Sequence, residues 1–143
     1  MPIVEWSDKY NTGIPDIDKE HRSLFALIND LYDKVEAGSA EISIKATFEA
    51  LADYVNYHFA REESLMAACH YNDLENHKAE HRKLKSRVEN YKQSYERDPQ
   101  SFDMADFMEF LTHWLQGHIL RSDMAYIPYV QYRVDTIVGN HAD

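Results

Sequence analysis

Two pairs of side chains that can bind a metal ion lie close together in the middle of the sequence. His58 and Glu62 are four residues apart, and so are His77 and His81. In a helix this spacing places both members of a pair on one face. Metal coordination is the chemistry that such groups share, because imidazole nitrogens and carboxylate oxygens both donate lone pairs to a cation.

The faces that carry these pairs are otherwise apolar. In alternating steps of three and four, the neighbouring positions are Phe48, Leu51, Val55, Leu84, Val88 and Tyr91. Both pairs therefore lie on the seam that should face the core of a helical bundle. Leaving an ionised group unpaired there costs several kcal/mol. The sequence thus predicts a cation between these helices; the competing interpretation is a well-packed core with hydrogen-bonded histidines.

Three more candidate ligands share this character. His21 lies on an apolar stripe with Ile17 and Leu24, and His118 follows another. Asp123 comes five residues after His118, which is about 140° round an ideal helix. If both point inward, the helix must either end or widen into a π-type turn between them.

Seven ligands are too many for one tetrahedral zinc ion. Five imidazoles with two carboxylates favour iron, with copper and zinc less favoured. Two six-coordinate ions offer about twelve positions. The imidazoles, two bridging carboxylates and a solvent-derived bridge leave one position open for a small ligand.

The neighbours of that position are predicted to be apolar. One turn from the ligands stand Leu24, Phe25, Phe59, Trp114, Ile119 and Leu120. A dry pocket favours a small apolar gas and disfavours proton delivery to reduced oxygen. No Asp, Lys or Ser on these seams is an obvious acid, base or nucleophile. These features favour reversible binding over catalysis.

The elements that must position these residues are long helices. The periodicity predicts an arm over 1–15, helices over about 16–37, 41–67, 72–97 and 101–120, and a tail over 121–143. Helices of this length joined by short loops give an all-α, up-down-up-down four-helix bundle. The arm should be extended, with its aromatic side chains packed on the bundle, and the short tail should fold back. We expect one domain over residues 1–143.

Composition limits the classes of function. With 15 basic and 25 acidic side chains the net charge is −10, which argues against a nucleic-acid partner. We expect no membrane span and no signal peptide. Cys69 is the single cysteine, which favours a reducing compartment, the cytoplasm. We expect a monomer, and the sequence identifies no protein partner.

Together these motifs resemble the single-domain bacterial hemerythrins. The likeness runs through Trp6, the run from Gly13 to His21, the two ligand pairs, and Trp114-Leu115 followed by His118, Ile119 and Asp123. It covers nearly the whole chain. The remaining histidines, which lie outside the family pattern, we take to be surface or supporting residues; they are His70, His113 and His141.

The resemblance implies a centre of two non-haem iron ions (Fe²⁺/Fe³⁺) with an oxo or hydroxo bridge that binds dioxygen. By matched position, His77, His81 and His118 would hold the filled iron, and His21 and His58 the iron with the open site. Glu62 and Asp123 would bridge the two. The walls of the oxygen pocket would be Leu24, Phe59, Trp114 and Leu120.

We therefore expect reversible oxygen binding, for storage, delivery or scavenging, and no enzymatic activity. Three alternatives remain open at this point. One is a di-iron oxidase, peroxidase or nitric-oxide-handling protein that uses the same site. Another is an oxygen-sensing module acting through a separate partner. The third is a helical bundle with zinc or without metal.

Overall fold

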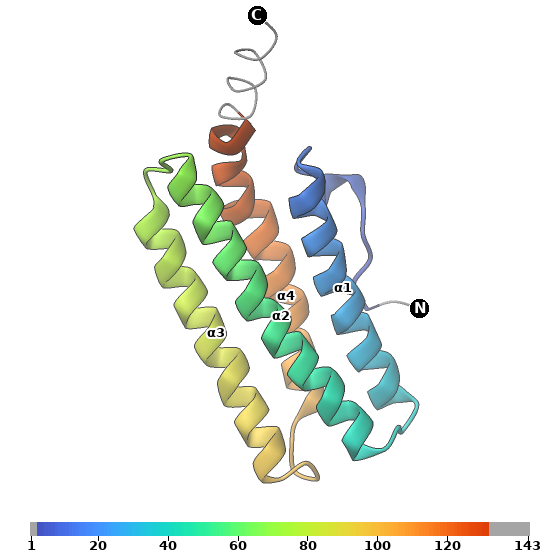
Figure 1. Cartoon of the computed structure of the whole chain (residues 1–143). Coiled ribbons are helices and arrows are strands. Elements are labelled where there is room, and N and C mark those ends of the chain that lie inside the picture. The colour runs from blue at the N-terminus through green and yellow to red at the C-terminus, as the bar shows by residue number, and fades with distance from the viewer. Residues whose placement is uncertain (1–2, 132–143) are drawn as a thin grey trace, which may run out of the picture.

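The computed structural model describes residues 3–131, which form a bundle of long helices (Figure 1). Their bounds are Pro15–Glu36 for α1, Glu41–Ala68 for α2, Leu74–Arg97 for α3 and Met104–Gly117 for α4. Successive helices run in opposite directions and are joined by short loops. The predicted all-α, up-down-up-down bundle is therefore confirmed.

The helix ends follow from local residue types. Pro15 occupies the first turn of α1, where its missing N–H costs no hydrogen bond. Gly38, just after α1, has φ +67°, the left-handed conformation that commonly closes a helix. His70 takes the same role after α2 with φ +57°, and the next N–H, of Tyr71, donates back to the Met66 carbonyl at 3.0 Å. The α2–α3 turn therefore uses a histidine where glycine is usual.

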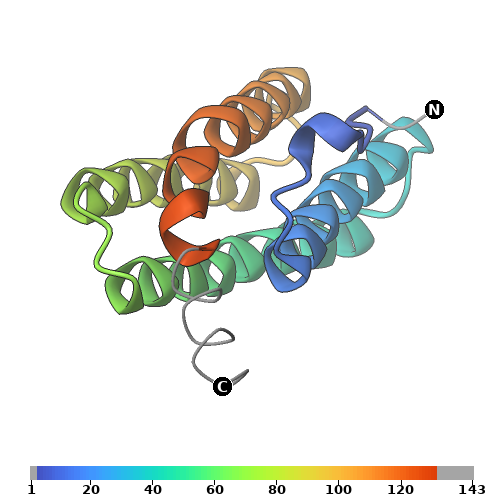
Figure 2. The ribbon, with the colours of Figure 1, turned by 90° about the horizontal axis from the view of Figure 1, so that it is seen from above.

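The N-terminal arm packs on the bundle as predicted. Val4 donates its N–H to the Asn29 side chain at 3.0 Å and accepts from the same amide at 2.8 Å. The rings of Trp6 and Tyr10 lie edge-on to Phe25, with centroids 5.3 and 5.1 Å apart. A short 3-10 helix, η1 (Asp8–Tyr10), brings the arm to α1. Figure 2 shows the arm lying between α1 and α4.

The chain beyond α4 differs from the predicted tail. It continues without a break as a π-helix, η2 (His118–Asp123), and then as α-helix over 124–131. Of the two alternatives at this point, the helix therefore widens and does not end. The predicted tail over 121–143 is wrong up to residue 131, because the apolar residues there continue the helix; the rest lies outside the described residues.

The buried side chains form two clusters with polar residues between them. The larger cluster fills the bundle between the four helices and the arm. The smaller one consists of Ile17, Met66, Tyr126, Ile127 and Val130, at the end where the C-terminal segment crosses α1 and α2. Within residues 3–131, no helix has the length and apolar character needed to cross a membrane.

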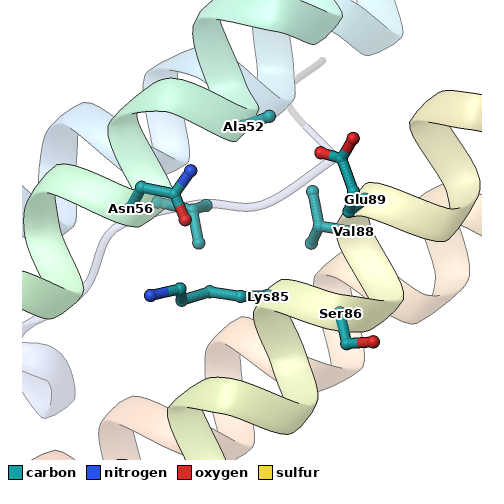
Figure 3. Close-up of a pocket in the computed structure, with 7 residues that line it drawn as sticks. Ala52, Asn56, Lys85, Ser86, Val88 and Glu89 are labelled. Atoms are coloured by element: carbon teal, nitrogen blue, oxygen red, sulfur yellow. The ribbon is translucent and has the colours of Figure 1, made fainter.

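A surface hollow of about 290 Å³ lies between α2 and α3 (Figure 3). Its floor is made by small or short side chains, Ala52, Val55 and Val88, and its rim includes Ser86 and Glu89. None of the predicted ligands lines it. Ser86 and Glu89 are therefore exposed positions on α3 that do not belong to the predicted ligand set.

Candidate metal centre

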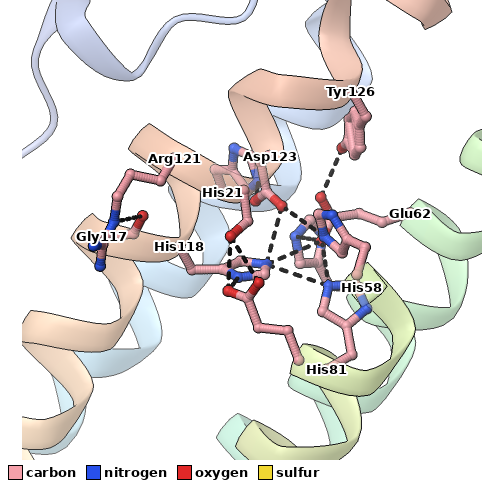
Figure 4. Close-up of polar contacts among 12 residues, drawn as sticks. His21, His58, Glu62, His81, Gly117, His118, Arg121, Asp123 and Tyr126 are labelled. Atoms are coloured by element: carbon pink, nitrogen blue, oxygen red, sulfur yellow. Dashed lines mark hydrogen bonds and ion pairs between the residues drawn. The ribbon is translucent and has the colours of Figure 1, made fainter. Parts of the chain in front are cut away.

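Seven buried side chains from different helices converge at one level of the bundle (Figure 4). Each is at most 4% exposed. His21 comes from α1, two come from α2, two from α3 and two from η2; the other six are His58, Glu62, His77, His81, His118 and Asp123. These are the seven residues predicted from the sequence, and the structure brings all of them together.

The seven side chains form two overlapping groups of donor atoms. One group consists of His77, His81 and His118 with both carboxylates, and the other of His21 and His58 with the same carboxylates. Within each group the donor atoms lie within 4.8 Å of one another. Glu62 and Asp123 belong to both groups. The arrangement can therefore hold two ions side by side with shared carboxylates.

The two oxygens of Asp123 face different groups. Oδ1 lies 3.0 Å from His118 Nε2 and 3.3 Å from His77 Nε2, whereas Oδ2 lies 3.0 Å from His21 Nε2. This is the disposition of a bridging carboxylate. The widened turn produces it: in a π-helix the i→i+5 hydrogen bond brings residues five apart above one another. His118 and Asp123 therefore both point inward.

Glu62 also reaches both groups. Its Oε1 lies 3.0 Å from His58 Nε2 in one group and 3.5 Å from His81 Nε2 in the other. Its Oε2 accepts a hydrogen bond of 2.6 Å from the Tyr126 hydroxyl. Both residues are at most 1% exposed. The phenol therefore fixes the outer oxygen of Glu62 while the inner oxygen faces the imidazoles.

Several donor atoms are buried without a hydrogen-bond partner. They are the Nε2 atoms of His21, His58 and His77, Oε1 of Glu62 and both carboxylate oxygens of Asp123. Buried polar atoms are normally satisfied. In each group these atoms lie within 4.8 Å of one another. A metal ion in each group would supply the missing partner, so the donor set fits a pair of metal ions.

Three carboxylates stand behind the imidazoles. Glu20, Glu63 and Glu80 lie 2.9, 2.9 and 2.8 Å from the Nδ1 atoms of His58, His81 and His118, in that order. A carboxylate at Nδ1 fixes the ring and leaves Nε2 for a metal. Sequence reasoning missed these carboxylates, although each is adjacent in sequence to a predicted ligand. That adjacency is the signal that could have found them.

In the metal-free protein the buried groups hold opposite charges. Burial opposes the charge on His58 and His118, but neighbouring carboxylates, Glu62 and Asp123 respectively, raise the pKa of each to about 10. Burial would raise the pKa of both carboxylates. The imidazoliums outweigh it, so that the pKa of Glu62 falls to about 2 and that of Asp123 lies well below its usual value. A metal ion would take the place of these protons.

Apolar and aromatic side chains close the centre on the side of the larger cluster. Phe59 stacks on the His81 ring with centroids 3.8 Å apart, and Trp114 meets Phe59 edge-on at 5.8 Å. Leu24, Leu115 and Ile119 are at most 1% exposed in the same cluster. Leu24, Phe59 and Trp114, three of the four predicted wall residues, are therefore buried in this cluster together with Leu115 and Ile119.

Leu120 does not agree with its predicted place in the pocket wall. Its side chain is 38% exposed and lies outside the cluster of buried residues. Leu120 belongs to the widened turn η2, and its side chain is partly open to solvent there. Two histidines outside the predicted set, His70 and His113, are exposed, and His141 lies outside the described residues.

Comparison with known proteins agrees with this geometry. Residues 12–130 match the family model described as hemerythrin HHE cation binding domain. The chain is 32% identical to a bacteriohemerythrin of Pseudomonas aeruginosa, covering 100% of this chain and 92% of that protein. It is also 32% identical to a bacteriohemerythrin of Clostridium acetobutylicum, covering 85% and 97%. A crystal structure of wild-type hemerythrin superposes with a TM-score of 0.81 at 29% identity, over 90% of this chain and 98% of that one. The chain belongs to the hemerythrin family.

Proposed function

We propose that this protein binds dioxygen reversibly at a pair of non-haem iron ions. The observation that carries the proposal is the shared use of two buried carboxylates by two groups of imidazoles. Nitrogen donors with few carboxylates favour iron over magnesium or calcium. The family to which the chain belongs supports the same metal.

The two halves of the centre are unequal. His77, His81 and His118 would hold one ion together with both carboxylates, whereas the other ion would have only His21 and His58 with them. The second ion therefore has one protein donor fewer, and this is where a small ligand would enter. Iron, when bound, supplies the electrons that dioxygen accepts on binding and returns on release.

The surrounding side chains favour release of the ligand intact. Leu24, Phe59 and Trp114 exclude water from the centre, and a dry site slows proton transfer to reduced oxygen. The Tyr126 hydroxyl donates a hydrogen bond to Glu62 Oε2. Burial, together with the charges of Glu62 and Asp123, raises the pKa of Tyr126 far above its ordinary value. Its phenol therefore remains a hydrogen-bond donor and does not supply protons.

An oxygenation experiment tests this proposal. Protein loaded with ferrous iron without air should contain about two iron ions per chain, one for each donor group. On exposure to air its absorption spectrum should change to that of a long-lived oxygenated form, and evacuation should restore the first spectrum. Rapid irreversible oxidation with turnover of an added substrate would refute reversible binding and favour a di-iron oxidase or peroxidase. Zinc or no metal after growth with sufficient iron would refute the iron assignment.

The proposal includes the setting in which the protein works. We propose a single hemerythrin-like domain over residues 1–143 that acts as a monomer in the cytoplasm, in oxygen storage, delivery or scavenging. The sequence contains a single cysteine, Cys69, and this supports a reducing compartment. The net charge of −10 supports a freely diffusing protein. Sedimentation tests whether the protein is a monomer, and cell fractionation tests whether it is cytoplasmic.

A further inference from the structure

One carboxylate on α3 contacts both ends of the widened turn. Glu80 Oε1 lies 2.8 Å from His118 Nδ1, and Ser122 Oγ lies 2.7 and 2.8 Å from the two oxygens of Glu80. His118 and Ser122 both belong to η2. The contact between α3 and η2 is therefore made to the Nδ1 atom of one predicted ligand, His118, and to the residue that precedes another, Asp123.

The hydroxyl of Ser122 matters because Glu80 is the most exposed of the three outer carboxylates. Its side chain is 40% exposed, against 25% for Glu63 and 11% for Glu20. Glu20 is also held by Arg61 at 3.0 Å. Within residues 3–131, Glu80 has no ion pair with a lysine or arginine. Apart from the His118 ring that it supports, the hydroxyl of Ser122 is therefore the group that keeps this long side chain from turning to water.

The turn itself needs such support. The π-helix is rare and occurs mostly as a single widened turn within an α-helix, frequently at a functional site. If this turn relaxed to α-helix, Asp123 would lie about 140° from His118 around the axis. Its carboxylate could then no longer face both donor groups. A contact that holds residues 118 and 122 to α3 opposes that relaxation.

We propose that Glu80 and Ser122 are a positioning pair for the metal centre. Glu80 orients the His118 ring so that Nε2 faces the centre, and Ser122 holds Glu80 while it ties η2 to α3. Neither residue belongs to either group of donor atoms. The inference relies on the proposed metal centre, but it does not depend on oxygen binding.

Release of Fe²⁺ to a chelator tests the pair. Ser122→Ala should lose iron about tenfold faster than the wild type, in the range found when partners of metal ligands are removed. Ser122→Thr keeps the hydroxyl and should restore the slow rate. Ser86→Ala, on the rim of the α2–α3 hollow, is the matched control and should behave as the wild type. Wild-type release from Ser122→Ala would overturn the proposal.

Two readouts separate positioning from a general loss of stability. In the metal-free protein, amide hydrogen exchange over residues 118–123 should be faster in Ser122→Ala and unchanged elsewhere. In Zn²⁺-loaded protein, the ¹⁵N chemical shifts of the His118 ring should differ from those of the wild type in Glu80→Gln. They should equal those of the wild type in Glu89→Gln. Unchanged exchange together with an unchanged ring would refute the pair. A protein that holds iron but never binds oxygen would refute the proposed function and leave this test intact.

Discussion

The phenol of Tyr126 should be a measurable source of stability. Its hydroxyl donates to Glu62 Oε2 at 2.6 Å in an interior where both residues are at most 1% exposed. Removal of the hydroxyl leaves one oxygen of a buried carboxylate without its partner. Hydrogen bonds to charged groups contribute about 1.5–3 kcal/mol. We therefore expect Tyr126→Phe to lower the free energy of unfolding by about 2 kcal/mol.

The assay is denaturant and thermal unfolding of metal-free protein, because a bound metal would add its own stabilisation. For a chain of this size, about 2 kcal/mol corresponds to a fall in melting temperature of roughly 4–8 °C. Tyr129→Phe is the matched control one turn away. The Tyr129 hydroxyl is 3.5 Å from Asn72 on the surface, and its loss should cost about 0.5 kcal/mol or less. Equal losses in the two variants would show that the buried hydrogen bond does not stabilise Glu62.

Three further predictions concern the α2–α3 turn, the predicted wall of the oxygen pocket, and the protons that metal binding releases. His70→Gly should raise the free energy of unfolding by about 1 kcal/mol, because φ +57° strains a residue with a Cβ; chemical denaturation checks this, and a loss would contradict it. Leu24→Asn should speed air oxidation of the ferrous protein about tenfold, equivalent to ~1.4 kcal/mol in the barrier. Leu120→Asn, at an exposed position, should not change that rate, and iron analysis controls for loss of metal. Metal binding at neutral pH should release protons, because the pKa of His58 and that of His118 are both about 10 without metal. The number released should fall as the pH approaches 10, and calorimetry in buffers of different ionisation enthalpy measures it; a pH-independent number would be the contrary result.

The convergence of the seven ligands could be predicted from the sequence because helical periodicity is a strong signal. Apolar residues in steps of three and four show which face is buried, and polar residues on that face are conspicuous. His58 and Glu62 are examples. Periodicity could not decide between an ended helix and a widened one after His118, because that choice depends on contacts with α3. Ser122 and Glu80 make one such contact, 42 residues apart in sequence.

The residues that the sequence did not identify are those whose partners lie on other helices. Tyr126 is 64 residues from Glu62, and no local pattern connects them. The mixed composition after Asp123 was consistent with an irregular tail, whereas packing on Ile17 and Met66 makes it helical. Leu120 was assigned to the pocket wall by its matched position, but its side chain is 38% exposed. Matching by position places a residue along the chain, whereas the direction of its side chain depends on the pitch of the turn that carries it.

The sharing of Glu62 and Asp123 between the two donor groups has a consequence for loading. Binding of a first ion would orient both carboxylates and displace the protons that keep the imidazoles charged, so that a second ion would meet a site already arranged for it. Uptake should then be close to all-or-none, and a sample given half the iron it can hold should contain filled and empty molecules, with few that carry a single ion.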